Sequence, residues 1–405
     1  MDMLRANIHP LIIYLDGVGY INLLHHEIKG MTCAMKILHL NAGNETGGGM
    51  HHILALLQQL DRKQFVLGVL EKGELMERAE AAGIQTVHFA NNMKMSVPLI
   101  SKIRNYIKQE KINFVHTHGP RANVYANILR RIVPFQWIVT IHSNPLLDFM
   151  GKGMYGNFLC KLNVGAIKHA DKLIAISEPF RTCLQDAGVS DGKIITALNG
   201  IDFHKNTEKA YTKEEFGFAE DDFVFLMVAR LERVKGHRVA FEAFAKLMTK
   251  QPNCQLVLLG EGSLKEELQR LAVQLGIGDH VHFMGHRNDV DCFYQLADIT
   301  LLTSVSESFP LVLLESARAE TPVIATDVGG VSELILNQSV GWKVDVGNVS
   351  EIAAAMEDAL LLYKRGMLSL IGKKLQAHAS IKFTVENFAE NVYNVYLSMK
   401  DNTGM

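Results

Sequence analysis

Two glutamates eight positions apart, Glu307 and Glu315, mark the segment of the sequence best suited to bind a ligand. Pro310 lies between them and suits the first turn of a helix, where its missing N–H costs no hydrogen bond. Glu307 is therefore predicted in the loop at the positive end of that helix, and Glu315 on its second turn. This arrangement suits a ligand that offers hydroxyls at two points, rather than the opposed carboxyls of a hydrolase. In the alternative interpretation, Glu307 only interacts with the helix dipole and Glu315 is a solvated residue of the helix surface.

Basic and glycine residues follow other predicted strands. Arg230 and Lys235 come after an apolar run and can neutralise a leaving diphosphate without a metal, Arg as a planar fork and Lys as a point charge. Two surface cations at a helix start are the alternative. Gly47-Gly48-Gly49 precedes a helix, where bare backbone amides can approach a phosphate. His142 ends a predicted strand and either reaches a substrate hydroxyl or has a structural role.

Two further motifs resemble metal-binding pairs. Asp289-Val-Asp291 opens a helical run, so helix-cap and dipole roles are favoured over a metal-binding Asp-x-Asp. His116-x-His118 has a suitable spacing, but no carboxylate or cysteine cluster accompanies it. We therefore predict no metal site and no cofactor.

Short apolar runs alternate with amphipathic stretches along the chain from Met35 onward. Most of the runs are continuous rather than alternating, as in parallel strands buried on both faces. Repeated strand–helix–strand units predict an α/β protein with two doubly wound sheets, whose ligands bind beyond the carboxyl ends of the strands. The predicted strands are 36–41, 65–70, 86–90, 114–118, 137–142, 172–177 and 194–198, then 223–230, 255–260, 281–285, 299–304, 322–327 and 341–345; the predicted helices include 239–250, 263–275, 350–363 and 384–400.

The length of 405 residues predicts more than one domain. We expect an extension at 1–34, a first Rossmann-like domain at 35–199 and a second at 200–383. Helix 384–400 has no strand after it and is expected to pack back on the first domain. The extension is either an upstream segment from a misassigned start or a small membrane-contacting or packing element. Its apolar run, 11–15, is too short to span a membrane.

Charge is distributed unevenly between the two predicted domains. Residues 35–199 carry 19 Lys and Arg against 12 Asp and Glu, whereas residues 200–405 carry 20 against 28. A basic domain paired with an acidic one suggests that the basic domain meets an anionic surface or substrate. The five cysteines are scattered without a C-x-x-C and indicate free thiols in a reducing cytoplasm.

Taken together, these motifs resemble the retaining glycosyltransferase family 4, which has the GT-B fold of two Rossmann-like domains facing a central cleft. The resemblance rests on four segments: Val139–His142, Ala229–Gly236, Glu307–Glu315 and Ala317–Gly330. It runs from about Met35 to the C-terminus and is strongest over 223–345. Residues 1–34 have no counterpart in the family pattern.

The resemblance implies roles for individual residues. Glu315 would accept hydrogen bonds from the nucleotide ribose, and Glu307 would hold hydroxyls of the transferred sugar. Arg230 and Lys235 would grip the diphosphate, and His142 would approach the sugar near its 6-hydroxyl. The implied donor site also includes residues of three loops: Gly47, Gly48, Gly49, Arg287, Ser308 and Phe309. The implied reaction is front-face transfer of a hexosyl unit from a nucleotide-diphosphate sugar, UDP being favoured over GDP, without a metal.

The acceptor is expected to be a glycan or a lipid-linked sugar, as in the synthesis of cell-surface polysaccharides and glycoconjugates. His118, Arg121 and Asn144 are candidate acceptor contacts in the first domain. Within residues 94–181 there are 13 Lys and Arg against 4 Asp and Glu, together with the apolar-basic stretch 146–159. We therefore expect a cytoplasmic enzyme that docks on the anionic inner face of the membrane and binds no nucleic acid. Solvated helix faces are the alternative explanation of this charge.

Three other functions compete with transfer. A nucleotide-sugar epimerase would alter the sugar without an acceptor, and a phosphorylase of the glycogen type would need a pyridoxal-phosphate lysine, which is not identified here. A non-catalytic nucleotide-sugar sensor is the third possibility. The joint presence of Arg230, Lys235, Glu307 and Glu315 argues against such a sensor.

Overall fold

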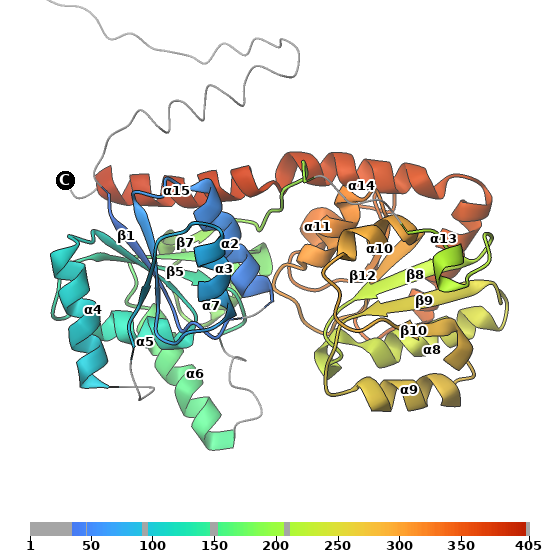
Figure 1. The fold of residues 1–405 in the computed structure, drawn as a ribbon, viewed down its shortest axis with the longest axis horizontal. Helices are drawn as coiled ribbons and strands as arrows, with labels where there is room; N and C mark the ends of the chain where they lie inside the picture. Colours follow the sequence, from blue (N-terminus) through green and yellow to red (C-terminus); the bar gives the residue numbers. More distant parts are fainter. Residues whose placement is uncertain (1–34, 46, 91–95, 146–152, 206–210, 402–405) are drawn as a thin grey trace, which may run out of the picture. The chain divides into compact units, whose positions relative to one another are not determined.

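The computed structural model describes residues 35–45, 47–90, 96–145, 153–205 and 211–401. The predicted extension at 1–34 and the segment 146–152 of the apolar-basic stretch lie outside these ranges. From Lys36 onward the chain forms a compact unit that contains all the described helices and strands (Figure 1). We call β1–β7 with helices α2–α7 the first lobe, and β8–β13 with helices α8–α14 the second lobe.

The first lobe is built on a parallel sheet of seven strands within the described residues, in the order β3-β2-β1-β4-β5-β6-β7. The order reverses between β1 and β4, as in a doubly wound sheet. Its elements are β1 (Ile37–Asn41), α2 (Gly48–Gln59), β2 (Phe65–Val69), α3 (Glu74–Ala81), β3 (Thr86–His88), α4 (Val97–Gln109), β4 (Phe114–His118), α5 (Pro120–Leu129), β5 (Gln136–Ile141), α6 (Gly153–Ile167), β6 (Lys172–Ala175), α7 (Glu178–Asp186) and β7 (Ile194–Thr196).

The second lobe repeats the design with six described parallel strands in the order β10-β9-β8-β11-β12-β13. Here the order reverses between β8 and β11. Its elements are β8 (Phe223–Val228), the short 3-10 helix η3 (Arg233–Lys235), α8 (His237–Met248), β9 (Cys254–Leu259), α9 (Lys265–Gln274), β10 (Val281–Phe283), α10 (Val290–Leu296), β11 (Ile299–Leu302), α11 (Leu311–Arg318), β12 (Val323–Thr326), α12 (Val331–Leu334), β13 (Trp342–Val344), α13 (Val349–Lys364) and α14 (Leu368–Lys382).

The two faces of the first sheet differ in chemistry because side chains alternate along each strand. On one face, Leu38 and Leu40 of β1 pack with Val115 of β4 and with apolar residues of α4 and α5. On the other face point His39 and, in register with it, His116. That second face is covered by α2 and by the C-terminal helix α15 (Val385–Asp401).

Helix α15 joins the first lobe through a polar contact as well as through packing. Figure 1 shows it next to α2, the helix that it contacts. The hydroxyl of Tyr396 lies 2.5 Å from Nδ1 of His116 and 3.2 Å from Nε2 of His39. The C-terminal helix therefore completes the histidine-bearing face of the first sheet.

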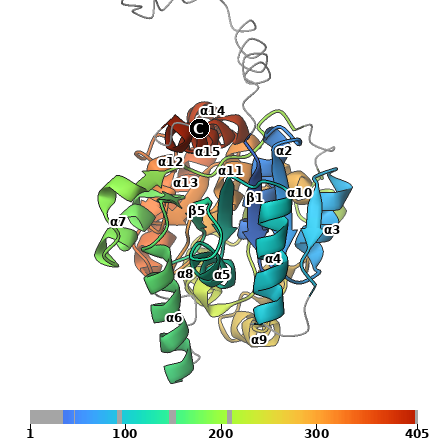
Figure 2. The ribbon, with the colours of Figure 1, turned by 90° about the vertical axis from the view of Figure 1, so that its left-hand side faces the viewer.

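Helix α6 exposes large apolar side chains. Met154 is 90% exposed, and Tyr155, Phe158 and Leu162 are also exposed. Figure 2 shows α6 extending beyond the strands of the first sheet. None of the helices within the described residues is long and apolar enough to cross a membrane. No disulfide joins the described cysteines, residues 160, 183, 254 and 292, to one another.

Candidate active site

The point at which the strand order of the second sheet reverses brings two loops together at one edge of the sheet. Strands β8 and β11 are neighbours, although β9 and β10 separate them in sequence. The loop after β8 carries Arg230 and Lys235, and the loop after β11 carries Glu307. Because ligands of doubly wound sheets bind at this reversal, beyond the carboxyl ends of the strands, these side chains lie where a ligand is expected.

A glycine allows the two loops to approach closely. Gly236 has a φ of 69°, and a Cβ there would lie 1.9 Å from the carbonyl oxygen of Thr303. Any other residue would force the loops apart. The hydroxyl of Thr303 donates to the carbonyl oxygens of Lys235 and Gly236, and the N–H of Val305 donates to the carbonyl of Val234. These bonds fix the backbone on both sides of the site.

Lys235 and Glu307 form a largely buried ion pair as a result. The ammonium Nζ lies 2.6 Å from Oε1 of Glu307, and the two side chains are 19% and 12% exposed. The hydroxyl of Ser304 donates to the same Oε1 at 2.6 Å. An ammonium group has three N–H donors, and Glu307 uses one of them. The pair can therefore present both a cation and a carboxylate to one ligand.

Arg230 lies at the same edge but points to solvent. Its side chain is 67% exposed, and its Nη1 bonds Oε1 of Glu232 at 2.8 Å. Such an exposed pair is weak, because water screens it. The arginine can therefore exchange this carboxylate for a ligand anion at little energetic cost.

Helix α11 positions Glu315 as the sequence predicts. Pro310 occupies the N-cap, the helix begins at Leu311, and Glu315 lies on its second turn. Oε2 of Glu315 accepts a hydrogen bond of 3.1 Å from the hydroxyl of Tyr294, a fully buried residue of α10. Burial and the nearby carboxylate raise the pKa of Tyr294 well above its usual range, so this hydroxyl remains a donor.

The loop after β12 supports the loop that carries Glu307. Gly329 has a φ of 54°, and a Cβ there would lie 2.4 Å from the carbonyl oxygens of Glu307 and Ser308. The N–H of Gly330 donates to the Ser308 carbonyl at 3.1 Å. The ring of Phe309 is buried beneath Gly330, so a contact between Phe309 and a ligand would come from its backbone.

The segment after β10 confirms one prediction in part, since Asp289 and Asp291 lie at the N-cap and in the first turn of α10. Asp289 occupies the N-cap of α10, but its carboxylate makes no cap hydrogen bond. Instead it pairs with both Nε and Nη2 of Arg287, at 2.8 and 2.5 Å, and accepts from the hydroxyl of Tyr211. The arginine bond is the main reason why the pKa of Asp289 falls to about 2. Asp291 pairs with Lys205 and Arg318.

The glycine loop, Gly47–Gly49, follows β1, where the strand order of the first sheet reverses. Gly47, with a φ of 67°, is the N-cap of α2, which has no side-chain cap. A Cβ on Gly47 or Gly48 would have no neighbour within 4 Å among the described residues, whereas one on Gly49 would lie 2.3 Å from Oε1 of Glu45. The start of α2 is thus open on the side of its first two glycines.

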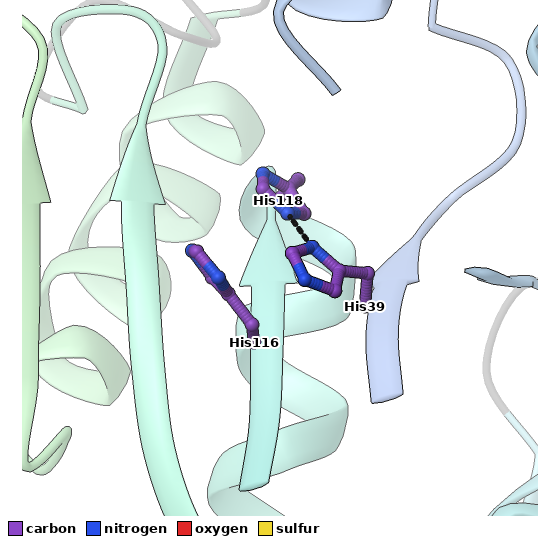
Figure 3. A group of neighbouring side chains, drawn as sticks. All are labelled: His39, His116 and His118. Carbon is purple, nitrogen blue, oxygen red and sulfur yellow. Dashed lines mark hydrogen bonds between the residues drawn. The ribbon is translucent and has the colours of Figure 1, made fainter. Parts of the chain in front are cut away.

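A cluster of five histidines lies at the same end of the first sheet, and the sequence analysis did not predict it. His39, His116 and His118 come from the adjacent strands β1 and β4 (Figure 3). His142 follows β5, and His52 projects from α2. Residues two apart on a strand share a face, so the pattern His116-x-His118 beside Thr140-x-His142 could have revealed it.

Hydrogen bonds link four of these histidines in a chain. Nε2 of His142 lies 2.9 Å from Nδ1 of His118, whose Nε2 lies 2.9 Å from Nδ1 of His39. The Tyr396 hydroxyl connects His39 with His116, which reaches the hydroxyl of Thr140 at 2.7 Å. Burial lowers the pKa of every member, to about 3 for His39, so the chain is neutral near pH 7.

The three candidate acceptor contacts have different surroundings. His118 is buried within the histidine chain. Arg121 is ion-paired with Glu71, and Oδ1 of Asn144 accepts from the thiol of Cys183 at 3.3 Å. His142 keeps partial exposure at the end of β5, which makes it the member of the cluster best placed to meet a ligand.

Comparison with known proteins identifies the family. The model for glycosyltransferase family 4 matches residues 46–205, and the model for glycosyl transferases group 1 matches residues 208–369. The putative glycosyltransferase EpsD of Bacillus subtilis is 34% identical over 311 residues, which cover 74% of this chain and 80% of EpsD. The chain therefore belongs to glycosyltransferase family 4.

Other glycosyltransferases resemble the chain over nearly its whole length. The UDP-Gal:alpha-D-GlcNAc-diphosphoundecaprenol alpha-1,3-galactosyltransferase of Escherichia coli is 23% identical over 92% of this chain and 99% of its own. The crystal structure of Anabaena HepE in complex with UDP has a TM-score of 0.79 at 21% identity, covering 90% of this chain and all of HepE. The fold is therefore GT-B, as the sequence predicted, and the protein is a glycosyltransferase.

Proposed function

We propose that this glycosyltransferase moves a hexosyl unit from a UDP-sugar to a glycan or lipid-linked acceptor, with retention of anomeric configuration and without a metal. The observation that carries the proposal is the contact between Lys235 and Glu307 at the strand reversal of the second sheet. An ammonium group directly beside a carboxylate suits a donor that carries both a diphosphate and sugar hydroxyls.

The cations act on the leaving group. Lys235 is held by Glu307 and directs its remaining N–H groups to a phosphate oxygen, and Arg230 exchanges Glu232 for the diphosphate. Fixed cations stabilise the charge that develops as the diphosphate departs and can replace a divalent ion. The amides of Gly47–Gly49 at the start of α2 offer a further phosphate contact.

The two glutamates orient the donor. Among the described residues, Lys235 and Ser304 both bond Oε1 of Glu307, and we assign Oε2 to hydroxyls of the transferred sugar. Glu315 keeps its bond from Tyr294 and binds the ribose hydroxyls. His142 approaches the sugar near its 6-hydroxyl, and Arg287 with Ser308 and Phe309 completes the donor site.

The reaction takes place on one face of the sugar. The bond between the anomeric carbon and the phosphate oxygen breaks, and the acceptor oxygen bonds to the same face of that carbon. The acceptor proton passes to an oxygen of the leaving phosphate. This path needs no protein nucleophile, and closure around the substrates limits hydrolysis of the donor.

The identities of two relatives support the choice of substrates. HepE has been crystallised with UDP and with UDP-glucose, and the Escherichia coli relative transfers galactose from UDP-Gal to a diphosphoundecaprenol-linked sugar. A lipid-linked acceptor requires that the enzyme reach a membrane surface. We therefore propose peripheral binding to an anionic cytoplasmic leaflet.

Helix α6 is the described element best suited to such binding. Met154, Tyr155 and Phe158 are exposed at its start, and the exposed Lys161 and Lys168 lie farther along the same segment. Aromatic and apolar side chains enter the interfacial region of a bilayer, and lysines are attracted to anionic headgroups.

Turnover in EDTA tests the proposed chemistry. The protein is incubated with a UDP-sugar, with and without a crude lipid-linked acceptor, and UDP release and the anomeric configuration of the product are measured. We expect acceptor-dependent UDP release that EDTA leaves intact, and a product with the donor's configuration. Loss of turnover in EDTA with recovery in magnesium or manganese would contradict the metal-free mechanism. An altered free sugar without acceptor would indicate an epimerase.

A further inference from the structure

We propose that His52, His118 and His142 form a binding site for a divalent transition-metal ion of the zinc class. One ring nitrogen from each residue lies within 4.8 Å of the other two. Three ligands around a tetrahedral zinc ion, each at about 2.0–2.1 Å, lie roughly 3.4 Å apart. The three rings are therefore close enough for side-chain rotation to bring one nitrogen of each into a coordinating position, with a fourth position left for water.

Two buried ring nitrogens distinguish this group. Nε2 of His52 and Nδ1 of His142 have no hydrogen-bond partner among the described residues, although both atoms are buried. A buried polar atom without a partner is destabilising and requires an explanation. A metal ion would satisfy a lone pair on each ring.

The hydrogen bond of His52 fixes which nitrogen faces the site. Nδ1 of His52 lies 2.6 Å from Oδ1 of Asn199, an oxygen that can only accept, so Nδ1 carries the proton. Nε2 therefore carries the lone pair. Metal-binding histidines typically donate their other N–H to a carbonyl or carboxylate, and Asn199 supplies this second contact.

His118 has a comparable support. If His118 binds the ion through Nδ1, the hydrogen bond between that nitrogen and His142 is lost. The hydrogen bond between Nε2 of His118 and His39 remains. His39 is in turn bonded to Tyr396. His39 and Tyr396 would then orient His118 as a metal ligand without binding the ion themselves.

The alternative trio in Figure 3, His39, His116 and His118, is less suitable. Both ring nitrogens of His39 and of His116 already have partners, namely His118, Tyr396 and Thr140. Binding an ion there would break these bonds, whereas the group that contains His52 and His142 offers two ring nitrogens without a hydrogen-bond partner among the described residues.

A bound ion would also regulate transfer, a consequence that rests on the proposed function of His142. A ring nitrogen that coordinates a metal cannot accept from a sugar hydroxyl. We therefore expect zinc to inhibit an enzyme whose chemistry needs no metal.

Zinc binding to the full chain, prepared without a histidine tag and stripped of metal, tests the site. Titration calorimetry should show one ion per chain, and cobalt should give the visible absorption of a tetrahedral complex. His52→Gln should weaken binding more than about tenfold, and Asn199→Ala by about 10–100-fold. His169→Gln, which removes an exposed histidine of the first lobe, should leave the affinity unchanged.

Anomalous scattering from a zinc-soaked crystal locates the ion even if a variant folds poorly. Density between His52, His118 and His142 supports the proposal. Failure to bind zinc, equal binding by a folded His52→Gln variant, or an ion bound elsewhere overturns it. Zinc bound at the site without loss of transfer supports the site and contradicts only the role assigned to His142.

Discussion

The ion pair of Lys235 and Glu307 has more to do with function than with stability. Taking two charges largely out of water costs nearly as much as their attraction returns, so such a pair adds little to folding. Its value lies in fixed geometry: Ser304 and the loop contact at Gly236 hold both groups before any ligand arrives. In the proposed reaction, a site organised in this way would stabilise the departing diphosphate without first having to rearrange.

Replacing Lys235 by alanine should therefore depress transfer severely. Removal of one preorganised charge-stabilising group typically lowers kcat by about 10²–10³-fold, and we expect a loss of this size. Steady-state UDP release measures it. Lys246→Ala is a matched control, because Lys246 belongs to the same lobe but bonds the exposed Ser350. Full activity in Lys235→Ala would show that the diphosphate site is wrongly assigned.

The histidine cluster should make the first lobe sensitive to acid. Burial lowers the pKa of His52 from 6.5 to about 4 and that of His39 to about 3. The unfolded chain regains the ordinary value and takes up protons first. The stability contributed by these neutral histidines is present above about pH 6.5 and is lost as the pH falls from 6.5 toward 4.

Urea unfolding at pH 7, 6 and 5 measures this dependence. In a Trp342→Phe background, Trp137 in β5 is the remaining tryptophan and reports on the first lobe. His52→Gln should reduce the slope between pH 6 and 5 by about 1.4 kcal/mol per pH unit, the contribution of one proton. His169→Gln should not change it. An unaltered slope in His52→Gln would mean that His52 is already protonated or exposed in the folded lobe.

The sequence pointed to candidate donor residues in the second lobe but not to the histidine cluster in the first. Glu307, Glu315 and the cations stand in short segments whose spacing carries the information. The cluster combines residues of β1, α2, β4 and β5, and His116-x-His118 on its own indicates little. Its members meet because β1, β4 and β5 are neighbours in the sheet and α2 covers the same face.

At the scale of elements, apolar periodicity located each strand within a few residues, since buried parallel strands are nearly continuous apolar runs. Strand 114–118 was predicted at its observed bounds, and helix 384–400 is α15 at Val385–Asp401. The sequence could not reveal that Asp289 pairs with Arg287 instead of capping α10. The same carboxylate also accepts from the hydroxyl of Tyr211, which is 78 residues away in the chain.

Tyr396 should contribute measurably to the attachment of α15. Tyr396→Phe removes the hydroxyl that lies between His39 and His116 and leaves their buried nitrogens without this partner. The expected loss is about 1–3 kcal/mol in the free energy of unfolding of the first lobe, measured by urea with Trp137 fluorescence. Tyr155→Phe, at an exposed tyrosine of α6, should change it by less than about 0.5 kcal/mol. Equal effects of the two substitutions would contradict this role of the hydroxyl.

Helix α6 should control binding to membranes. Sedimentation with anionic vesicles at low salt should exceed sedimentation with neutral vesicles, and Phe158→Ser with Met154→Ser should reduce it several-fold, because apolar area no longer enters the bilayer. Val273→Ser, at an exposed valine of α9, is the control. Equal partition onto neutral and anionic vesicles would rule out an electrostatic contribution, and unchanged binding by the α6 variant would show that another surface docks.

For the whole molecule, nucleotide binding should appear as a gain in stability. A ligand that binds only the folded state stabilises it by about 2.7 kcal/mol at 100 times its dissociation constant. We expect UDP and UDP-sugars to raise Tm by several degrees, more than GDP and GDP-sugars do, with EDTA present throughout. Glu315→Ala should reduce the shift because the ribose loses its acceptor on α11, whereas Glu266→Ala on the exposed surface of α9 should not. A larger shift with GDP would overturn the choice of nucleotide, and a full shift in Glu315→Ala would place the ribose elsewhere.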